Sequence, residues 1–520
     1  MNILFTAQSE GLKIFHHVLE RIREPLAIDK TGFYVAQSMY YRRFIKQHPE
    51  FESKHAIEKE WRIVEESKKR KPNTDNVRSY EKTIGNPTLW EPLVCDRRVY
   101  LGKLCKVKQD YRPRYSHEQM LSILEVALER LEQLLGNVEP DIVLSLDPVT
   151  FGDYLLFLFC RARGIPIFFF RTTKIENYVE FNDGIFGCSE HIYRLFREYE
   201  NQDTLQDEWI EHAQAYLQGV GKNDIRYEGM ILIPSKQKKG KPKRALVSSL
   251  VRGLRTESEY LLKCRKDHGV PGLLTPFLYR KLISPFRAGV HNWKYSRHYI
   301  SQDRLDSIDF AFYPLQSEPE ISSLIWGKSY MNHIETIRNV ARSIPVGMKL
   351  LVKEHPRALG YRSFGYYRKI LEIPNVLLAC PDQEVQPIIE RSKLVISIAT
   401  FVAFEAAIKR IPSIMLGGPR PFSILPDSMI RYVHSINDLA VEIADLMENY
   451  EYKEGPLVRY IAATMRGSVP IDYFTVLLQK KGRYGDQGID RFDEEIEKLA
   501  KYTISRITDC LSDKRQSTCV

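Results

Sequence analysis

The segment 394–416 reads LVISIATFVAFEAAIKRIPSIML and contains one complete strand–helix–strand unit. Its two apolar runs, Leu394–Ile398 and Ser413–Leu416, have the length and branched residues of strands that are buried on both faces. The run Phe401–Lys409 between them predicts a helix. Two parallel strands need a crossover of this kind, so the segment predicts a βαβ unit of a parallel sheet.

The same alternation extends to both sides of this segment. Further strands are predicted at Phe310–Tyr313, Lys349–Val352 and Val376–Leu378, and helices at Tyr330–Ser343, Ser363–Leu371, Glu384–Ser392 and Asn437–Asn449. The connections are short, which favours a doubly wound sheet. Such a sheet binds its ligand at the carboxyl ends of its strands.

The first half of the chain shows the pattern less continuously. Strands are predicted at Ile3–Phe5, Asp141–Asp147 and Ile165–Phe170, and a helical tail at Asp490–Ser512. The 520 residues exceed what one core usually accommodates. We therefore predict an α/β protein with two Rossmann-like lobes, an interlobe cleft and a helical C-terminal tail.

The predicted domains follow from these elements, although the order of elements in 50–115 stays open. The first lobe spans 1–190, and a mostly helical, basic interdomain region spans 191–300. The second lobe spans 301–450, and residues 451–520 form helices that pack back on the first lobe.

Polar residues follow the first two strands of the second lobe. Glu318 and Glu320 lie in a loop with a proline between them, where one carboxylate could meet a sugar hydroxyl while the other holds the loop. A polar turn that caps the next helix explains them equally well. Lys353, His355 and Arg357 follow the second strand and could meet a phosphate and a ribose.

Three further features lie at the same sheet edge. Ser397 and Thr400 could bind phosphate at a helix start, or only cap that helix. Glu405 could reach ribose hydroxyls from within the helix, or lie on its solvated face. The pair Gly417 and Gly418 would let the backbone approach a ligand, or form only a turn.

The motifs FYPLQSEPE (312–320), LLVKEHPR (350–357) and VISIATFVAFEAAIKRIPSIMLG (395–417) together resemble the capsule polysaccharide biosynthesis family. That family includes bacterial β-Kdo transferases and has a glycosyltransferase-B architecture. The resemblance covers roughly residues 308–420. This chain departs from the family's Q-P-E-like element, because Ser317 and Glu318 stand between Gln316 and the proline.

The resemblance implies a glycosyltransferase that moves a CMP-activated ulosonic acid, such as Kdo, onto a surface or capsular glycan. It places Gln316, Glu318 and Glu320 on the Q-P-E-like element and His355 near the cytidine phosphate. Ser397 and Thr400 fall on the family's hydroxyl element. Glu405 is similar to the helix glutamate that many such enzymes use on the nucleotide ribose.

The first lobe should then supply a base or nucleophile, because the acceptor must meet the donor across the cleft. The candidates are Glu10, in the loop after the first predicted strand, and Asp147, at the end of a later one. His355 and Glu318 complete the predicted catalytic set. The resemblance implies no cofactor, with the CMP-sugar as substrate, and no metal is expected because the chain has no D-x-D triplet.

Two other functions fit the same pattern. A teichoic-acid-like polyol-phosphate transferase would share the architecture and a CMP-linked donor. A polysaccharide export or assembly factor could keep the fold without catalysis, although it would not need Lys353, His355 and Glu405 at the strand ends.

The formal net charge of +10 is concentrated at Lys236–Arg244, which reads KQKKGKPKR. This run predicts a solvated linker or, alternatively, peripheral contact with an anionic membrane, and no nucleic-acid module accompanies it. The start of the chain lacks a signal-peptide pattern, and eight cysteines occur without a C-x-x-C pair. We therefore expect a cytoplasmic protein.

Overall fold

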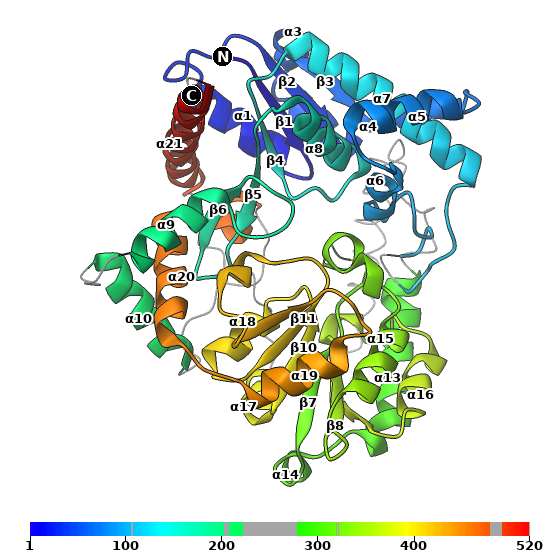
Figure 1. The fold of residues 1–520 in the computed structure, drawn as a ribbon. Helices are drawn as coiled ribbons and strands as arrows, with labels where there is room; N and C mark the ends of the chain where they lie inside the picture. The colour runs from blue at the N-terminus through cyan, green and yellow to red at the C-terminus, as the bar shows by residue number, and fades with distance from the viewer. Residues whose placement is uncertain are drawn as a thin grey trace, which may run out of the picture.

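The computed structural model describes residues 1–105, 108–201, 207–221, 278–318, 320, 322–478 and 491–518. Two β-sheets, the first mostly parallel and the second entirely parallel, form two lobes that lie one above the other in Figure 1. The chain passes from the blue and cyan upper lobe to the green and yellow lower one.

The first lobe contains a seven-stranded sheet in the order β13-β6-β5-β4-β1-β2-β3. Its strands are β1 (Ile3–Ala7), β2 (Thr31–Val35), β3 (Ala56–Lys59), β4 (Ile142–Leu146), β5 (Ile167–Thr172), β6 (Tyr178–Asn182) and β13 (Val469–Pro470). Strands β1 to β5 pair in parallel, whereas β6 runs antiparallel to β5 and to β13. Every residue of β1 and β4 is buried, as expected of central strands.

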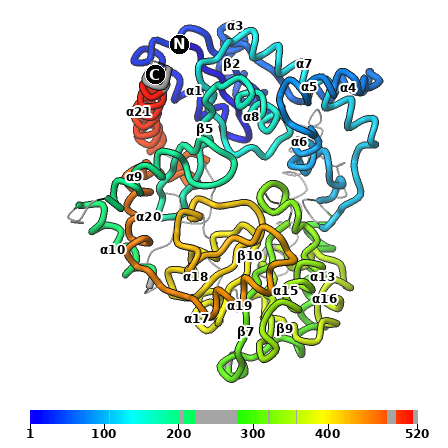
Figure 2. Tube along the Cα trace, viewed as in Figure 1, coloured from blue at the N-terminus to red at the C-terminus, as the bar shows by residue number. Residues whose placement is uncertain are grey.

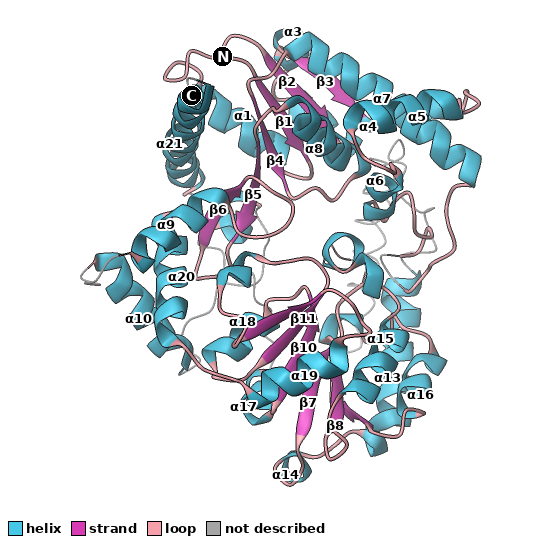
Figure 3. Cartoon of the chain, viewed as in Figure 1, coloured by secondary structure: helices cyan, strands magenta, loops and turns pink. Residues whose placement is uncertain are grey.

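Helices cover both faces of this sheet (Figure 3). They are α1 (Gly11–Ile22), α2 (Ser38–Ile45), α3 (Phe51–Lys54), α4 (Glu60–Ser67), α5 (Thr74–Ile84), α6 (Trp90–Cys95), α7 (His117–Val138) and α8 (Phe151–Arg163). Local chemistry sets their ends. Ser116 begins α7 with a capping box, and Thr150 caps α8, which ends at Gly164 with a φ of 64°.

The second lobe contains a six-stranded parallel sheet in the order β12-β11-β10-β7-β8-β9. Its strands are β7 (Phe310–Pro314), β8 (Lys349–Lys353), β9 (Val376–Ala379), β10 (Leu394–Ile398), β11 (Ser413–Leu416) and β12 (Ile430–Val433). Its helices are α14 (Gln302–Leu305), α15 (His333–Ser343), α16 (Phe364–Leu371), α17 (Gln386–Arg391), α18 (Val402–Ile408) and α19 (Leu439–Glu448).

Further helices lie beside the two sheets; in Figure 2, α13 is in the second lobe and α21 lies beside α1 of the first lobe. They are α9 (Glu190–Glu200), α10 (Glu208–Gly221), α13 (Ser284–Tyr295), α20 (Glu454–Arg466) and α21 (Phe492–Thr518). Helix α20 packs against both α9 and α10, and α21 packs along α1. The chain therefore returns to the first lobe after completing the second.

The predicted fold class is confirmed: two Rossmann-like lobes are present, with a helical tail. The open region 50–115 contains α3 to α6 and strand β3. Strands β6, β12 and β13 were not predicted. Strands β6 and β13 pair with each other across about 290 residues of sequence, and no local pattern indicates such a pairing. The run Lys236–Arg244 lies outside the described residues. No helix in the described ranges is long and apolar enough to cross a membrane.

Candidate functional site

A pocket of about 240 Å³ lies between the lobes, at the carboxyl ends of the second sheet. The loops after β7, β8, β10 and β11 form most of its wall, and the turn between β5 and β6 of the first lobe completes it. Five of the residues predicted from the sequence line this pocket: Gln316, Glu320, Lys353, His355 and Thr400.

Gln316 fixes the loop after β7. Its side-chain amide donates a hydrogen bond to the carbonyl of Ile398 at the end of β10, and Ser322 donates to its Oε1 at 3.5 Å. Gln316 is 5% exposed. It therefore joins two strand ends beneath the pocket while its side chain forms part of the wall.

Lys353 and His355 enter the pocket from the end of β8. Lys353 is 3% exposed, and its Nζ donates to the carbonyl of Pro381 at 2.8 Å. Burial lowers the pKa of Lys353 to about 8. The backbone N–H of His355 donates to Glu354 Oε1 at 2.8 Å, which fixes the backbone that carries the imidazole.

Glu354 in turn pairs with Arg362, which is 1% exposed. Arg362 Nε donates to Glu354 Oε2 at 2.5 Å, and its Nη2 donates to the Gln316 carbonyl at 2.7 Å. Tyr367 donates a further hydrogen bond to Glu354 at 2.7 Å. One buried guanidinium thus connects the loops after β7 and β8, so the two predicted motifs are held in a fixed geometry.

Glu318, a predicted catalytic residue, does not line the pocket. Its Oε1 lies 2.8 Å from His333 Nε2, and its Oε2 accepts hydrogen bonds from Tyr111 at 2.5 Å and from Gln109 at 3.0 Å. Burial tends to raise the pKa of Glu318, but the His333 hydrogen bond and the charge of Arg362 lower it to about 2. Because Gln109 and Tyr111 precede α7, this ionised carboxylate joins the first lobe to the second. The sequence offered no sign of these partners.

The turn from β10 to α18 is sharp. Ala399 has a φ of 44°, in the left-handed region that non-glycine residues rarely occupy. Thr400 follows at the pocket wall, and its buried Oγ1 has no hydrogen-bond partner among the described residues. Ser397, which was predicted beside it, lies inside β10 at 0% exposure and does not reach the pocket.

The glycines after β11 approach protein rather than open space. Gly417 has a φ of 97°, and a Cβ placed on it would lie 2.6 Å from the Trp326 carbonyl. Gly418 donates its N–H to that carbonyl at 2.5 Å, and a Cβ on it would lie 2.5 Å from the Phe186 ring. The predicted close approach is present, but it is made to Trp326 and to the first lobe.

Two other predicted nucleotide contacts lie off the pocket wall. Glu405 accepts a hydrogen bond from Gln386 at 3.1 Å and contributes attraction to the charge of Lys174. Arg357 lies in the short helical turn Pro356–Ala358, and its side chain is outside what the structure describes.

The two acidic candidates of the first lobe are in different places. Asp147 follows β4 and pairs with Arg171, and its charge acts on both Lys174 and Arg420 of the pocket. Glu10 precedes α1 and pairs with Arg43. Neither lines the pocket, although Asp147 lies within electrostatic range of it.

The residues of the pocket wall that sequence reasoning missed include Lys174, Trp326 and Arg420. The Arg420 guanidinium carbon lies 3.7 Å from the centroid of the Trp326 ring, and Trp326 Nε1 donates to the Ile185 carbonyl of the first lobe at 2.9 Å. Arg420 could have been found from its place two residues after the paired glycines. Lys174 lies in a turn with no recognisable motif.

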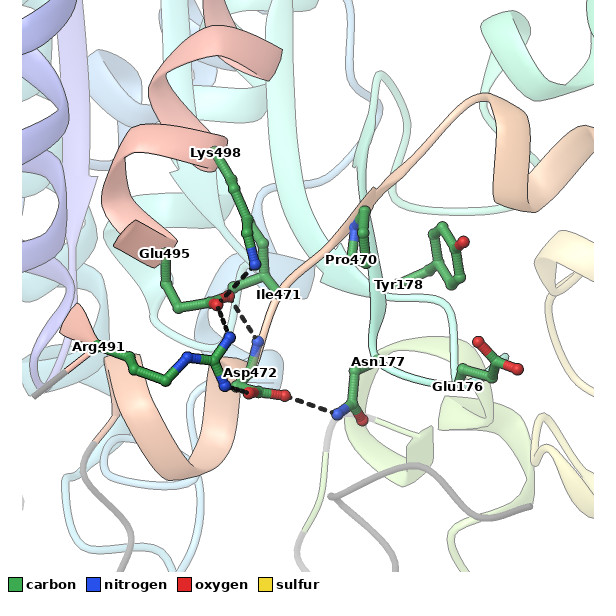
Figure 4. Close-up of a pocket in the computed structure, with 9 residues that line it drawn as sticks. All are labelled: Glu176, Asn177, Tyr178, Pro470, Ile471, Asp472, Arg491, Glu495 and Lys498. Atoms are coloured by element: carbon green, nitrogen blue, oxygen red, sulfur yellow. Dashed lines mark hydrogen bonds and ion pairs between the residues drawn. The ribbon is translucent and has the colours of Figure 1, made fainter. Parts of the chain in front are cut away.

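A second pocket, of about 280 Å³, lies where β6, β13 and α21 meet (Figure 4). Four of its charges pair with one another, since Arg491 pairs with Asp472 and Glu495, and Lys498 pairs with Glu495 (Figure 4). Asp472 also accepts a hydrogen bond from Asn177 at 2.8 Å. This pocket is the junction that attaches the C-terminal helix to the first lobe.

No family model and no curated protein matches this chain. Among solved structures, it is similar to the KpsC beta Kdo 2,4 transferase of Thermosulfurimonas dismutans, with 11% identity over 62% of this chain and 79% of that chain and a TM-score of 0.33. It is also similar to the UDP-GlcNAc 2-epimerase of Neisseria meningitidis, with 14% identity over 90% and 98% of the two chains and a TM-score of 0.27. The spinosyn rhamnosyltransferase SpnG matches at 11% identity over 89% and 95%, with a TM-score of 0.25. At these values none of the matched structures assigns an activity to this chain.

Proposed function

We propose that the chain is a glycosyltransferase that moves a sugar, Kdo or a related ulosonic acid, from a CMP-activated donor onto a surface glycan. One observation carries the proposal: the interlobe pocket gathers Lys353 and His355 from the end of β8, Thr400 from the end of β10, and Lys174 of the other lobe. A phosphate-linked ligand fits these groups, because cations and a free hydroxyl stabilise phosphate oxygens.

In this proposal the donor phosphate lies against Lys353, His355 and Thr400. The Thr400 hydroxyl can donate a hydrogen bond to it, since no described residue already accepts one. The ammonium of Lys353 favours the negative charge that builds on the phosphate as its bond to the sugar breaks. These groups would let the reaction proceed without a metal ion.

The acceptor would enter from the first lobe, where Asp147 is the proposed base or nucleophile. Its carboxylate follows β4 and is oriented by Arg171, which also donates to the Ile185 carbonyl at 3.2 Å. Asp147 is favoured over Glu10 because its charge acts on pocket residues, whereas Glu10 pairs with Arg43 beside α1.

Substitution of His355 tests the role of the second lobe in turnover. His355→Ala should lower turnover of a CMP-sugar by about 100-fold or more, the usual scale for losing one group that stabilises transition-state charge. The melting temperature should stay within about 2 °C, because His355 is half-buried at the pocket wall. A variant with unchanged turnover contradicts the assigned role.

Analysis of the product separates sugar transfer from polyol-phosphate transfer. A glycosidic bond in the product supports the proposal, and a phosphodiester bond supports the alternative. A chain that binds nucleotides but forms neither bond would instead fit an assembly factor.

A further inference from the structure

Two cations of the pocket stand apart from the predicted phosphate contacts. Lys174 comes from the turn between β5 and β6 of the first lobe, and Arg420 comes from the loop after β11 of the second lobe. The backbone of Lys174 has a φ of 64°, an uncommon conformation for a residue with a side chain. Both line the same pocket, so the two lobes bring like charges together.

Aromatic rings hold both cations in place. Arg420 lies 3.7 Å from the centroid of the Trp326 ring, and Lys174 Nζ lies 5.5 Å from that of the Phe401 ring. Such contacts position a cation and leave its charge available to another partner. Burial and mutual repulsion lower the pKa of Lys174 to about 8, and burial together with Arg171 lowers that of Arg420 to about 10.

Their charges lack a dedicated counter-ion. Within the described part of the chain, neither Lys174 nor Arg420 forms an ion pair, and Arg420 Nε is buried without a hydrogen-bond partner. Glu405, Glu320 and Asp147 attract the charge of Lys174, but they do not cancel the effect of burial, because the pKa of Lys174 is still lowered. Asp147 itself pairs with Arg171, and Glu405 accepts a hydrogen bond from Gln386 at 3.1 Å. Two half-buried cations that repel each other destabilise the folded chain, so an anionic ligand is the expected compensation.

A single phosphate does not account for this arrangement. Lys353, His355 and Thr400 already provide a cation, an imidazole and a hydroxyl in the same pocket. Resting on the proposed function, we infer that Lys174 and Arg420 form a second anion subsite, which binds a further negative group of the donor. In a CMP-linked ulosonic acid that group is the carboxylate of the sugar, and it is a second phosphate only if the donor is instead a nucleoside diphosphate sugar.

Binding of matched nucleotides to the whole chain tests this inference. Calorimetry compares the monophosphate and the diphosphate of cytidine, uridine, guanosine and thymidine, and includes a CMP-linked sugar acid, CMP-N-acetylneuraminate. The variants are Lys174→Gln and Arg420→Gln, with Lys46→Ala as a control at an exposed lysine after α2, outside the pocket lining. Melting temperatures confirm that each variant is folded.

For the wild type, the ligand with two anionic groups should bind about tenfold more tightly than its monophosphate, the scale of one charge-assisted hydrogen bond. Lys174→Gln and Arg420→Gln should each remove most of that preference and leave monophosphate affinity within about twofold, whereas Lys46→Ala should change neither. If Arg420→Gln is unfolded, Lys174→Gln alone decides the outcome. If the diphosphate binds more tightly than the monophosphate, the group at the second subsite is a phosphate. If only the CMP-linked sugar acid binds more tightly, that group is the carboxylate of the sugar.

Two results overturn the inference while the proposed function stands. One is equal affinity of the wild type for ligands with one and two anionic groups. The other is that Lys174→Gln loses affinity equally for ligands with one anionic group and for ligands with two. If the wild type binds none of these nucleotides, the proposed function itself fails, and the second subsite fails with it.

Discussion

At the scale of single residues, charge determines what the pocket can do. Arg362 is the clearest case, because its guanidinium is 1% exposed and holds Glu354, Glu318 and the Gln316 carbonyl at once. The sequence predicted polar strand ends here but not this arginine, which lies nine residues beyond the end of β8 and carries no motif of its own. Its importance arises from folding, which brings the loops together.

Removing this guanidinium should leave two buried carboxylates, Glu318 and Glu354, without their shared cation. Arg362→Met is expected to lower the free energy of unfolding by about 3–5 kcal/mol, as measured by urea denaturation. Arg368→Met is the matched control, since Arg368 is 69% exposed and pairs with Glu372 at the end of α16. Similar stability losses in the two variants would show that the buried network is not needed.

The pocket lysines should also make nucleotide binding depend on pH. Burial lowers the pKa of both Lys174 and Lys353 to about 8, so both are mainly charged at pH 7 and mainly neutral at pH 9. Affinity for a nucleotide should therefore fall as pH rises through this window, by about tenfold for each lysine that contacts the anion. Calorimetry at pH 7, 8 and 9 checks this, and affinity that rises with pH would rule out contact through these ammonium groups.

At the scale of elements, the sequence predicted regular pieces better than the turns between them. The boundaries of β10 and β11 agree with their apolar runs, and α21 covers most of the predicted tail. The loops were harder to interpret, because the glycine pair Gly417 and Gly418 would allow the backbone to approach a ligand or to pack closely against protein equally well. Only the position of Trp326 in space distinguishes the two uses, and that position depends on contacts distant in sequence.

The turn after β11 gives a test of this packing role. Gly417→Ala places a Cβ 2.6 Å from the Trp326 carbonyl at a φ of 97°, so it should lower stability by about 1–3 kcal/mol. Gly365→Ala, in helix α16 with no atom near its Cβ position, should instead raise stability by about 0.4–1 kcal/mol. Thermal unfolding of both variants measures the difference, and equal shifts would contradict the packing role.

At the scale of the whole molecule, long-range contacts place the lobes. Trp326 reaches Ile185, Glu318 reaches Tyr111, and Gly187 donates its N–H to the carbonyl of Pro419 at 3.1 Å. None of these pairs follows a local pattern, so the sequence predicted two lobes and a cleft but not the residues that join them. The same contacts bring Lys174 to the pocket of the other lobe.

The interlobe pocket is proposed to bind a nucleotide-linked sugar, and a crystal structure of the chain with CMP tests this. The phosphate is expected within hydrogen-bond distance of Thr400 Oγ1 and the Lys353 and His355 side chains. A nucleotide bound elsewhere, including the junction of β6, β13 and α21, or crystals that bind none at saturating concentration, would contradict it.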